Sequence, residues 1–309
     1  MKEEIVYEQP TEQDQELFLK EMGVTREQVK KNVHHLKSWL ASNSDLPAVQ
    51  DEAFLERFHS HCKFSLEKTK KKLEIYYKTR ALEPEILRDR DPLHPSIRLT
   101  KEKAFHVTLP RLTPQDKQRV TIMRLFSPDA TDLNMDIVLK AGLMMLDLNM
   151  SRDLASGHIL VIDSNHFSTA HLCKLTPSFI RKCDTCSTKA FPHRYSSVHF
   201  LNVLPFMQTT MNLFKTFLGT KMSSRILIHS SYETFYEYVP REILPKEYGG
   251  TYPFSITEIR DDGYRIMVEE RNWYLEQGRM FAELEEKRKD DTFRDIFGCK
   301  GTFRKIEID

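Results

Sequence analysis

The sequence predicts an α/β domain with a largely parallel sheet, preceded by an all-helical module. Three observations predict this fold. Through the first third of the chain, apolar residues recur at helical spacing. From about residue 120 onward, short apolar runs rich in β-branched residues alternate with helical patterns. Between the two regions stand Pro92 and Pro95, and each proline disfavours helix at the residue before it.

The helical module is predicted from capping signals. Thr25, followed three residues later by Gln28, is typical of a capping box at a helix start. A second helix is expected to begin near Glu52, and Ser65 is expected to cap a third. Four lysines at positions 68 and 70–72 of that third helix are interpreted as a solvated face and not as a membrane patch. The module is assigned to residues 1–95.

The α/β domain is assigned to residues 96–254 from the alternation of its elements. Residues 159–162 are apolar on both faces, as expected of a central covered strand. Thr176 and Pro177 fit the N-cap and first position of a helix. A helical extension with a short terminal strand is expected over 255–309. The expected strands cover 120–126, 158–163, 197–203 and 225–229, and the expected helices cover 135–148, 177–187 and 206–217.

Composition narrows the class of protein. The chain carries 46 basic and 45 acidic residues, so no overall field attracts it to nucleic acid, and we expect no nucleic-acid partner. Five scattered cysteines are too few and odd in number for a disulfide framework. The first residues lack the apolar stretch of a secretory signal, and no apolar run approaches the roughly 20 residues that span a bilayer. A cytoplasmic protein is therefore expected.

The usual enzymatic signatures of an α/β sheet are missing from the sequence. There is no Gly-x-Gly-x-x-Gly, no Gly-Lys-Ser/Thr phosphate loop, no Gly-x-Ser-x-Gly and no His-Glu-x-x-His. Asp163, at the end of the central strand, is interpreted as a cap of the following turn and not as a catalytic acid. We therefore assign no catalytic residue, no cofactor and no metal.

Two weaker patterns keep an enzyme as an alternative. Cys183 and Cys186 form a Cys-x-x-Cys, but they fall inside a predicted helix, where neither a helix N-terminus nor an obvious cation lowers a thiol pKa. His166 and His171 are spaced to reach one ion, but no third ligand is evident nearby. Structural roles are favoured for all four residues, ahead of redox or metal chemistry.

The segment 206–217 distributes apolar side chains over more than one helix face, whereas an ordinary surface helix carries one apolar stripe. A helix that covers a cavity in one state and meets a membrane in another has this pattern, and so does a buried core helix. Methionines are dense between residues 135 and 150, where they suit either an irregular apolar ligand or core filling. The pattern alone does not decide between these interpretations.

Several segments resemble the CRAL-TRIO family, in the family's order, over roughly residues 30–255. Residues 157–163 resemble its central strand, residues 217–221 with Arg225 follow its lid region, and residues 244–250 match its closing motif closely. The resemblance is strongest to the α-tocopherol transfer and retinaldehyde-binding branch. The ending over residues 301–309 resembles arthropod members.

The resemblance implies a lipid-transfer protein without catalytic activity. It would hold one hydrophobic ligand between the sheet and a mobile lid helix at residues 202–221, and the expected ligand is a tocopherol, a retinoid or another isoprenoid. The alternatives are a lipid-sensing regulatory or scaffold protein, and a member of the family that binds phospholipids or phosphoinositides. Carried onto this sequence, the pocket wall comprises Ile137, Met144, Ile162, Leu175, Phe179, Cys183, Phe191, Phe206, Leu213, Phe214 and Phe217.

The same branch has a cationic patch beside the lid that binds phosphoinositides. Arg194, Lys221 and Arg225 occupy matching positions. The sequence departs from the pattern at Ser196, where a second arginine is expected, and at residues 60–62, where Ser-His-Cys replaces Arg-x-Arg. The expected partners are therefore a small hydrophobic lipid and, transiently, a membrane that contains phosphoinositides. The protein is expected to be a monomer.

Overall fold

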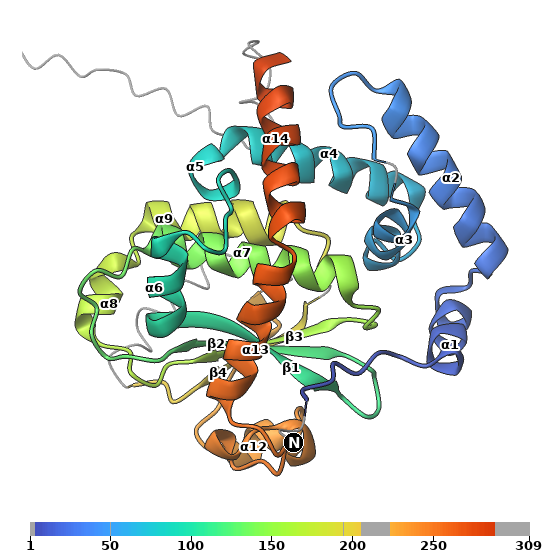
Figure 1. Ribbon diagram of the computed structural model, residues 1–309. Helices are drawn as coiled ribbons and strands as arrows, with labels where there is room; N and C mark the ends of the chain where they lie inside the picture. The colour runs from blue at the N-terminus through green and yellow to red at the C-terminus, as the bar shows by residue number, and fades with distance from the viewer. Residues whose placement is uncertain (1–3, 50, 194, 205–222, 288–309) are drawn as a thin grey trace, which may run out of the picture.

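The computed structural model describes residues 4–49, 51–193, 195–204 and 223–287. The predicted helix starts of the N-terminal module are confirmed, since the Thr25 hydroxyl accepts from the Gln28 N–H at 3.2 Å and the Ser65 hydroxyl accepts from the Lys68 N–H at 3.4 Å. Figure 1 shows the helices of this module grouped beside the sheet. They are α1 (Glu12–Met22), α2 (Arg26–Ser42), α3 (Glu52–His61), α4 (Leu66–Leu82) and α5 (Pro84–Leu87).

The sheet has five strands in the order β1-β2-β3-β4-β5. Strands β1 and β2 are antiparallel, and the pairs from β2 to β5 are parallel, so the predicted largely parallel sheet is confirmed. Strand β1 was not predicted. The strands are β1 (Ala104–Leu112), β2 (Arg119–Leu125), β3 (His158–Asp163), β4 (Tyr195–Leu201) and β5 (Ile226–Ile228).

Helices cover both faces of the sheet (Figure 1). Helix α7 packs so closely on β1 that a Cβ atom on Gly142 would lie 2.4 Å from Cε1 of His106. Phe235 and Tyr248 belong to the hydrophobic cluster around the sheet, which also contains Met144 and Met145 of α7. The remaining elements are α6 (Pro95–Lys103), α7 (Met135–Arg152), α8 (Thr169–Lys174), α9 (Pro177–Cys183), the π-helix η1 (Asp184–Lys189), α12 (Tyr232–Tyr236), the short 3-10 helices η2 (Arg241–Ile243) and η3 (Lys246–Tyr248), α13 (Ile256–Glu269) and α14 (Arg271–Lys287).

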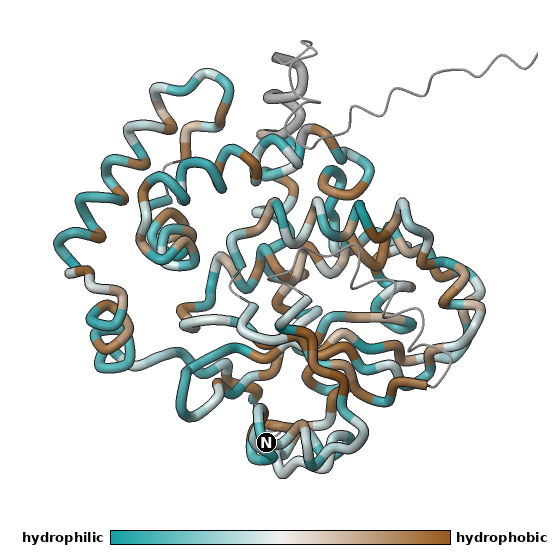
Figure 2. The backbone as a smooth tube through the Cα atoms, turned by 180° about the vertical axis from the view of Figure 1, so that it is seen from behind, coloured by the Kyte–Doolittle hydropathy of each residue, from teal (hydrophilic) through white to brown (hydrophobic). Residues whose placement is uncertain are grey.

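One hydrophobic cluster is shared by the N-terminal module and the α/β domain. Phe58 and Tyr76 of the module pack in it with Leu143 and Met150 of α7 and with Phe191. A second cluster lies around the sheet, whose central strands are strongly hydrophobic along their length (Figure 2). The module therefore rests on α7, and α7 rests on the sheet.

A buried ionic group joins the same two parts of the chain. The Asp147 carboxylate of α7 accepts from the Tyr76 hydroxyl at 2.7 Å and from Nη2 of Arg80 at 2.7 and 2.8 Å. It also accepts from Nη1 of Arg90. Both arginine side chains and the aspartate side chain are 0% exposed. From α14, the Tyr274 hydroxyl donates to the Met144 carbonyl of α7 at 2.8 Å.

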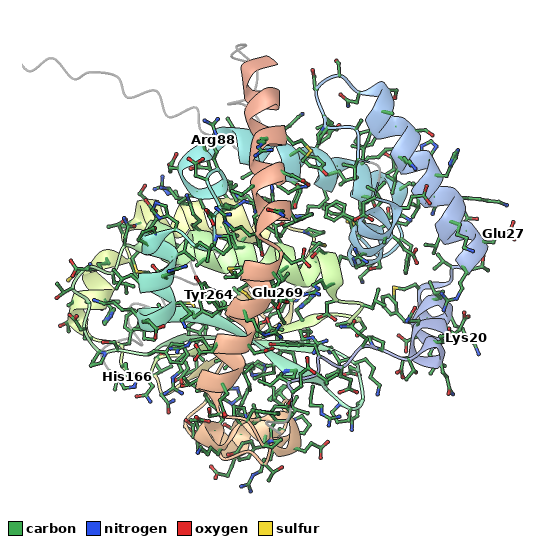
Figure 3. All side chains as sticks on the ribbon, in the orientation of Figure 1. Lys20, Glu27, Arg88, His166, Tyr264 and Glu269 are labelled. Atoms are coloured by element: carbon green, nitrogen blue, oxygen red, sulfur yellow. The ribbon has the colours of Figure 1, made fainter. Side chains whose placement is uncertain are left out.

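The C-terminal helices run from the sheet to the N-terminal module (Figure 1). Tyr264 of α13, labelled in Figure 3, donates its hydroxyl to the Pro92 carbonyl at 2.8 Å. Among the described residues, no helix is both long enough and apolar enough to cross a membrane. The helix predicted at 206–217 and the strand predicted at 301–309 lie outside the described residues.

Candidate functional site

Strands β2 to β5 carry a row of apolar side chains on one face, which we call the apolar strip: Met123, Leu160, Ile162, Phe200 and Ile226. Strand register aligns them, because Met123 pairs with Ile162 and Ile162 pairs with Phe200. In the same way Leu160 pairs with Val198, and Val198 pairs with Ile226. Since register partners in a parallel sheet point to the same side, the five side chains share one face.

Within the described part of the chain, packing does not fully cover the side chains of the apolar strip. Its five side chains are half-buried and belong to none of the three described hydrophobic clusters. On the opposite face, Ile159 and Val161 are 4% and 0% exposed and pack in the second cluster. Two of its members, Phe200 and Ile226, lie on the strands β4 and β5, which flank the predicted lid in sequence. Apolar area of this kind is typical of a ligand pocket.

The predicted wall residues fall into three groups. Ile162 lies in the apolar strip, and Ile137 and Leu175 are half-buried outside it. Phe179 and Cys183 pack against the cluster shared with the module, which contains Phe191, and Met144 is 0% exposed in the second cluster. Their roles as ligand contacts stay predictions. The predicted residues that lie outside the described part of the chain are Phe206, Leu213, Phe214 and Phe217.

Four members of the apolar strip were missed at the sequence level. Leu160 stands two residues before Ile162 in β3, and the alternation of a strand places both on one face. Met123, Phe200 and Ile226 come from three other strands. Their position beside Ile162 depends on register, which the sequence analysis did not assign.

Asp163 holds the carboxyl end of the sheet together. Its Oδ1 accepts from the Asn165 N–H at 2.9 Å and from Nδ2 of Asn202 at 2.8 Å, and its Oδ2 accepts from the Tyr248 hydroxyl at 2.8 Å. The interpretation as a turn cap is confirmed. The bond to Tyr248 further attaches the closing motif, residues 244–250, to the end of the central strand.

A second candidate site, the cationic cleft, opens at the amino ends of β3 and β4, with a volume of about 970 Å³. Helices α1 and α4 form its other walls. Ser196 and Cys62, which stand where arginines were expected, both line it, and so does His61. Arg194 and Lys221 lie outside the described residues. The cations that line the cleft are Lys63, Lys68, Lys71, Lys72, Lys117 and Arg225.

The lysines of α4 do not all form a solvated face. Lys68 and Lys71 are exposed at the rim of the cleft. Lys72 is half-buried, and its Nζ donates to the Thr188 carbonyl at 3.3 Å and to the Lys189 carbonyl, at the end of η1. The solvated-face interpretation is therefore wrong for Lys72. Its ammonium group lies at the C-terminal carbonyls of η1, where the helix dipole stabilises a cation.

The thiols lack the electrostatic environment of redox cysteines. Burial raises the pKa of Cys183 and of Cys186 to about 12 each, and it raises the pKa of Cys62 to about 11. These thiols therefore stay protonated near neutral pH, whereas a reactive cysteine needs a lowered pKa.

The paired histidines are likewise not arranged around an ion. His171 is buried, and its Nδ1 is 2.8 Å from the Ser168 hydroxyl. His166 is exposed in the loop before α8 (Figure 3). Within the described ranges, no three histidine, cysteine or acidic side chains meet in a way that could hold a metal ion.

Comparisons with known proteins agree with this architecture. The model of the CRAL/TRIO domain matches residues 111–250, and a model described as "Pinta-like, UBA domain" matches residues 25–97. Clavesin-1 of Xenopus laevis is 26% identical over 239 residues, which are 75% of this chain and 71% of that protein. Clavesin-2 of Homo sapiens is 22% identical over 237 residues, covering 75% and 72%. A crystal structure of Sfh5 aligns with a TM-score of 0.49 and 16% identity, covering 80% of this chain and 98% of that one.

The fold, the apolar strip and the family-model matches together define the class: this is a lipid-binding or lipid-transfer protein. Its helical module, parallel sheet and closing motif stand in the order that the resemblance predicted. Residues 111–250 of the chain form a CRAL/TRIO domain.

Proposed function

We propose that this protein carries one hydrophobic ligand, a tocopherol, a retinoid or another isoprenoid, and moves it between membranes without catalysing a reaction. The apolar strip carries this proposal. Burying ~500 Å² of ligand surface at ~25 cal/mol/Å² would contribute ~12 kcal/mol before association costs of at least ~4 kcal/mol are subtracted. Apolar contact alone therefore supports useful affinity.

Transfer requires that the ligand enter and leave at a membrane. In this proposal the lid is the segment 202–221, and the protein works as a monomer in the cytoplasm, touching membranes transiently. An acidic residue in place of Phe214 or Phe217 would make membrane insertion of the lid costly. Transfer of a fluorescent lipid between vesicles should then slow in both variants, and unchanged rates in both would exclude the lid assignment.

The ligand proposal is tested directly by purifying the protein without added lipid. Native mass spectrometry of the intact protein, with analysis of an organic extract, should yield one lipid per chain. Ile162→Gln and Phe200→Gln should lower lipid occupancy, whereas Ile266→Gln, at a half-buried position on α13, should leave it unchanged. Equal occupancy in all three variants would refute the apolar strip as the binding surface.

We further propose that the cationic cleft binds phosphoinositide head groups. Arg225, one of the predicted phosphoinositide residues, lines the cleft with five lysines, and lysines and arginines form charge-assisted bonds with phosphate. Arg225→Ala with Lys71→Ala should weaken binding to phosphoinositide vesicles, and so should Arg194→Ala with Lys221→Ala. If both double variants bind such vesicles like the unaltered protein, the cleft is not a phosphoinositide site.

A further inference from the structure

Three histidines from separate elements stack against one another where the N-terminal module meets the α/β domain. His61 ends α3, His158 begins β3, and His193 precedes β4. The ring centroids are 5.3 Å apart for His61 and His158, 5.6 Å for His61 and His193, and 4.7 Å for His158 and His193. We call this stack the histidine triad.

The histidine triad is part of the wall of the cationic cleft. His61 and His193 both line the cleft, together with the lysines of α4. Tyr195 stacks on His193 from β4, with centroids 5.9 Å apart, and Phe191 lies 5.5 Å from it on another side. A charge on the triad would therefore act on whatever occupies the cleft, while aromatic rings cover the triad elsewhere.

We propose that the histidine triad links anion binding in the cationic cleft to proton uptake, so that the cleft holds an anion more tightly as the pH falls. This inference rests on the proposed function of the cleft as an anion site. It extends that function by making the affinity for the anion depend on pH, which the lysines and the arginine alone would not do.

The surroundings of the triad keep its member His193 uncharged near neutral pH. Burial lowers the pKa of His193 well below its usual value, and the neighbouring His158, His61 and Lys72 lower it further. An anion in the cleft opposes the repulsion from these neighbours, so binding raises the pKa of the triad. By linkage, affinity for the anion then increases as the pH falls through the raised pKa.

The other groups that face the cleft give little or opposite pH dependence. Lysine and arginine titrate far above neutral pH. Burial raises the pKa of Cys62 to about 11 and also raises the pKa of Tyr195, so both groups stay uncharged. Hydrogen bonds from Thr11 lower the pKa of Asp14, which therefore stays ionised. The acidic residues that line the cleft are Asp14, Glu21 and Asp116.

The test uses an anion whose own charge is constant, because phosphate itself titrates near pH 6. Binding of inositol hexakissulfate to the full chain is measured by calorimetry at about pH 7.5 and about pH 5.5. If binding raises one triad pKa to about 6.5, the dissociation constant should fall about tenfold between these conditions. His193→Gln and His158→Gln should each reduce that ratio to about threefold or less, while retaining binding through the lysines.

A matched control comes from the other face of the sheet. His199 and His229 also stack, with centroids 5.0 Å apart, but neither lines the cleft. His199→Gln should therefore retain the full pH ratio. An equal ratio in the unaltered protein and in His193→Gln would overturn the inference while leaving the cleft as an anion site. If Arg225→Ala leaves binding unchanged at both pH values, the proposed anion site itself fails.

A second measurement needs no variant and guards against misfolding. NMR titration of the imidazole C–H signals in the unaltered protein gives the histidine pKa values with and without inositol hexakissulfate. The anion should raise at least one pKa of the triad to about 6.5, the value that corresponds to a tenfold change in affinity between the two pH values. Triad signals that titrate identically in both samples would overturn the inference.

Discussion

Replacing Asp147 by asparagine tests the joint between the N-terminal module and the α/β domain. The carboxylate compensates two arginines whose side chains are 0% exposed, and it also accepts from the Tyr76 hydroxyl. Asparagine preserves the shape, but it removes the negative charge that Arg80 and Arg90 share. Its amide also has to face one of the two guanidinium groups, which are themselves only donors.

The expected loss of stability is about 3–5 kcal/mol, the cost of breaking a buried ion pair by removing one partner. With a urea slope of about 3 kcal/mol/M for a chain of this size, the unfolding midpoint should fall by about 1 M. Unfolding is followed by far-UV circular dichroism and by the fluorescence of the two tryptophans, Trp39 in α2 and Trp273 in α14. Together the two signals report on both ends of the chain.

Asp261→Asn provides the control, because Asp261 also binds a lysine and an arginine but its side chain is 48% exposed. Exposed pairs contribute about 0–1 kcal/mol, so its midpoint should shift by less than about 0.3 M. If the two substitutions shift the midpoint equally, the buried group does not stabilise the joint in the way described.

Three further predictions concern packing, thiols and pH. Gly142→Ala should lower the free energy of unfolding by about 1–3 kcal/mol, because its methyl group would meet the His106 ring at 2.4 Å. His106→Ala in the same chain should recover most of that loss, and additive effects of the two substitutions would contradict the contact. Iodoacetamide should alkylate the exposed Cys173 well before the buried Cys186, whose pKa is raised to about 12. Mass spectrometry of peptides taken over time gives the order of alkylation, and the reverse order would contradict this prediction. Burial lowers the pKa of His59 and of His106 to about 4 each, so both side chains are neutral in the folded protein near neutral pH. The free energy of unfolding should therefore fall by up to about 1.4 kcal/mol per pH unit for each histidine as the pH drops from about 6.5 toward 4. Urea midpoints at several pH values check this, and His59→Gln should reduce the dependence on pH.

Much of the fold could be predicted because local signals agreed with tertiary packing. The predicted strand over 158–163 coincides with β3, and Pro177 begins α9 with Thr176 as its N-cap. Strand β1 was missed even though Phe105, Val107 and Leu109 alternate with polar residues. Those polar residues face α7, where His106 is half-buried and Thr108 is buried, so the strand does not show the exposed polar face of a simple half-polar strand.

The candidate site was predicted only in part, because it depends on contacts between distant segments. Ile162 could be chosen from the central strand, but its neighbours Met123 and Phe200 follow from sheet register. The lysine run looked like an isolated solvated face because nothing local indicates that Lys72 reaches the end of η1. The histidine triad joins residues 61, 158 and 193, a combination that no short motif contains.

The cluster shared by α4, α7 and Phe191 bears on how such chains evolve and how they can be divided. The CRAL/TRIO match begins at residue 111, near the end of β1, and the module match ends at residue 97, inside α6. A fragment cut at these limits would lose most of β1, an edge strand of the described sheet, and expose the apolar side of α7 to water. The two matched segments therefore share one hydrophobic cluster, and neither contains all of it. Exchange of either half between relatives should succeed only when the residues of the shared cluster are transferred with it.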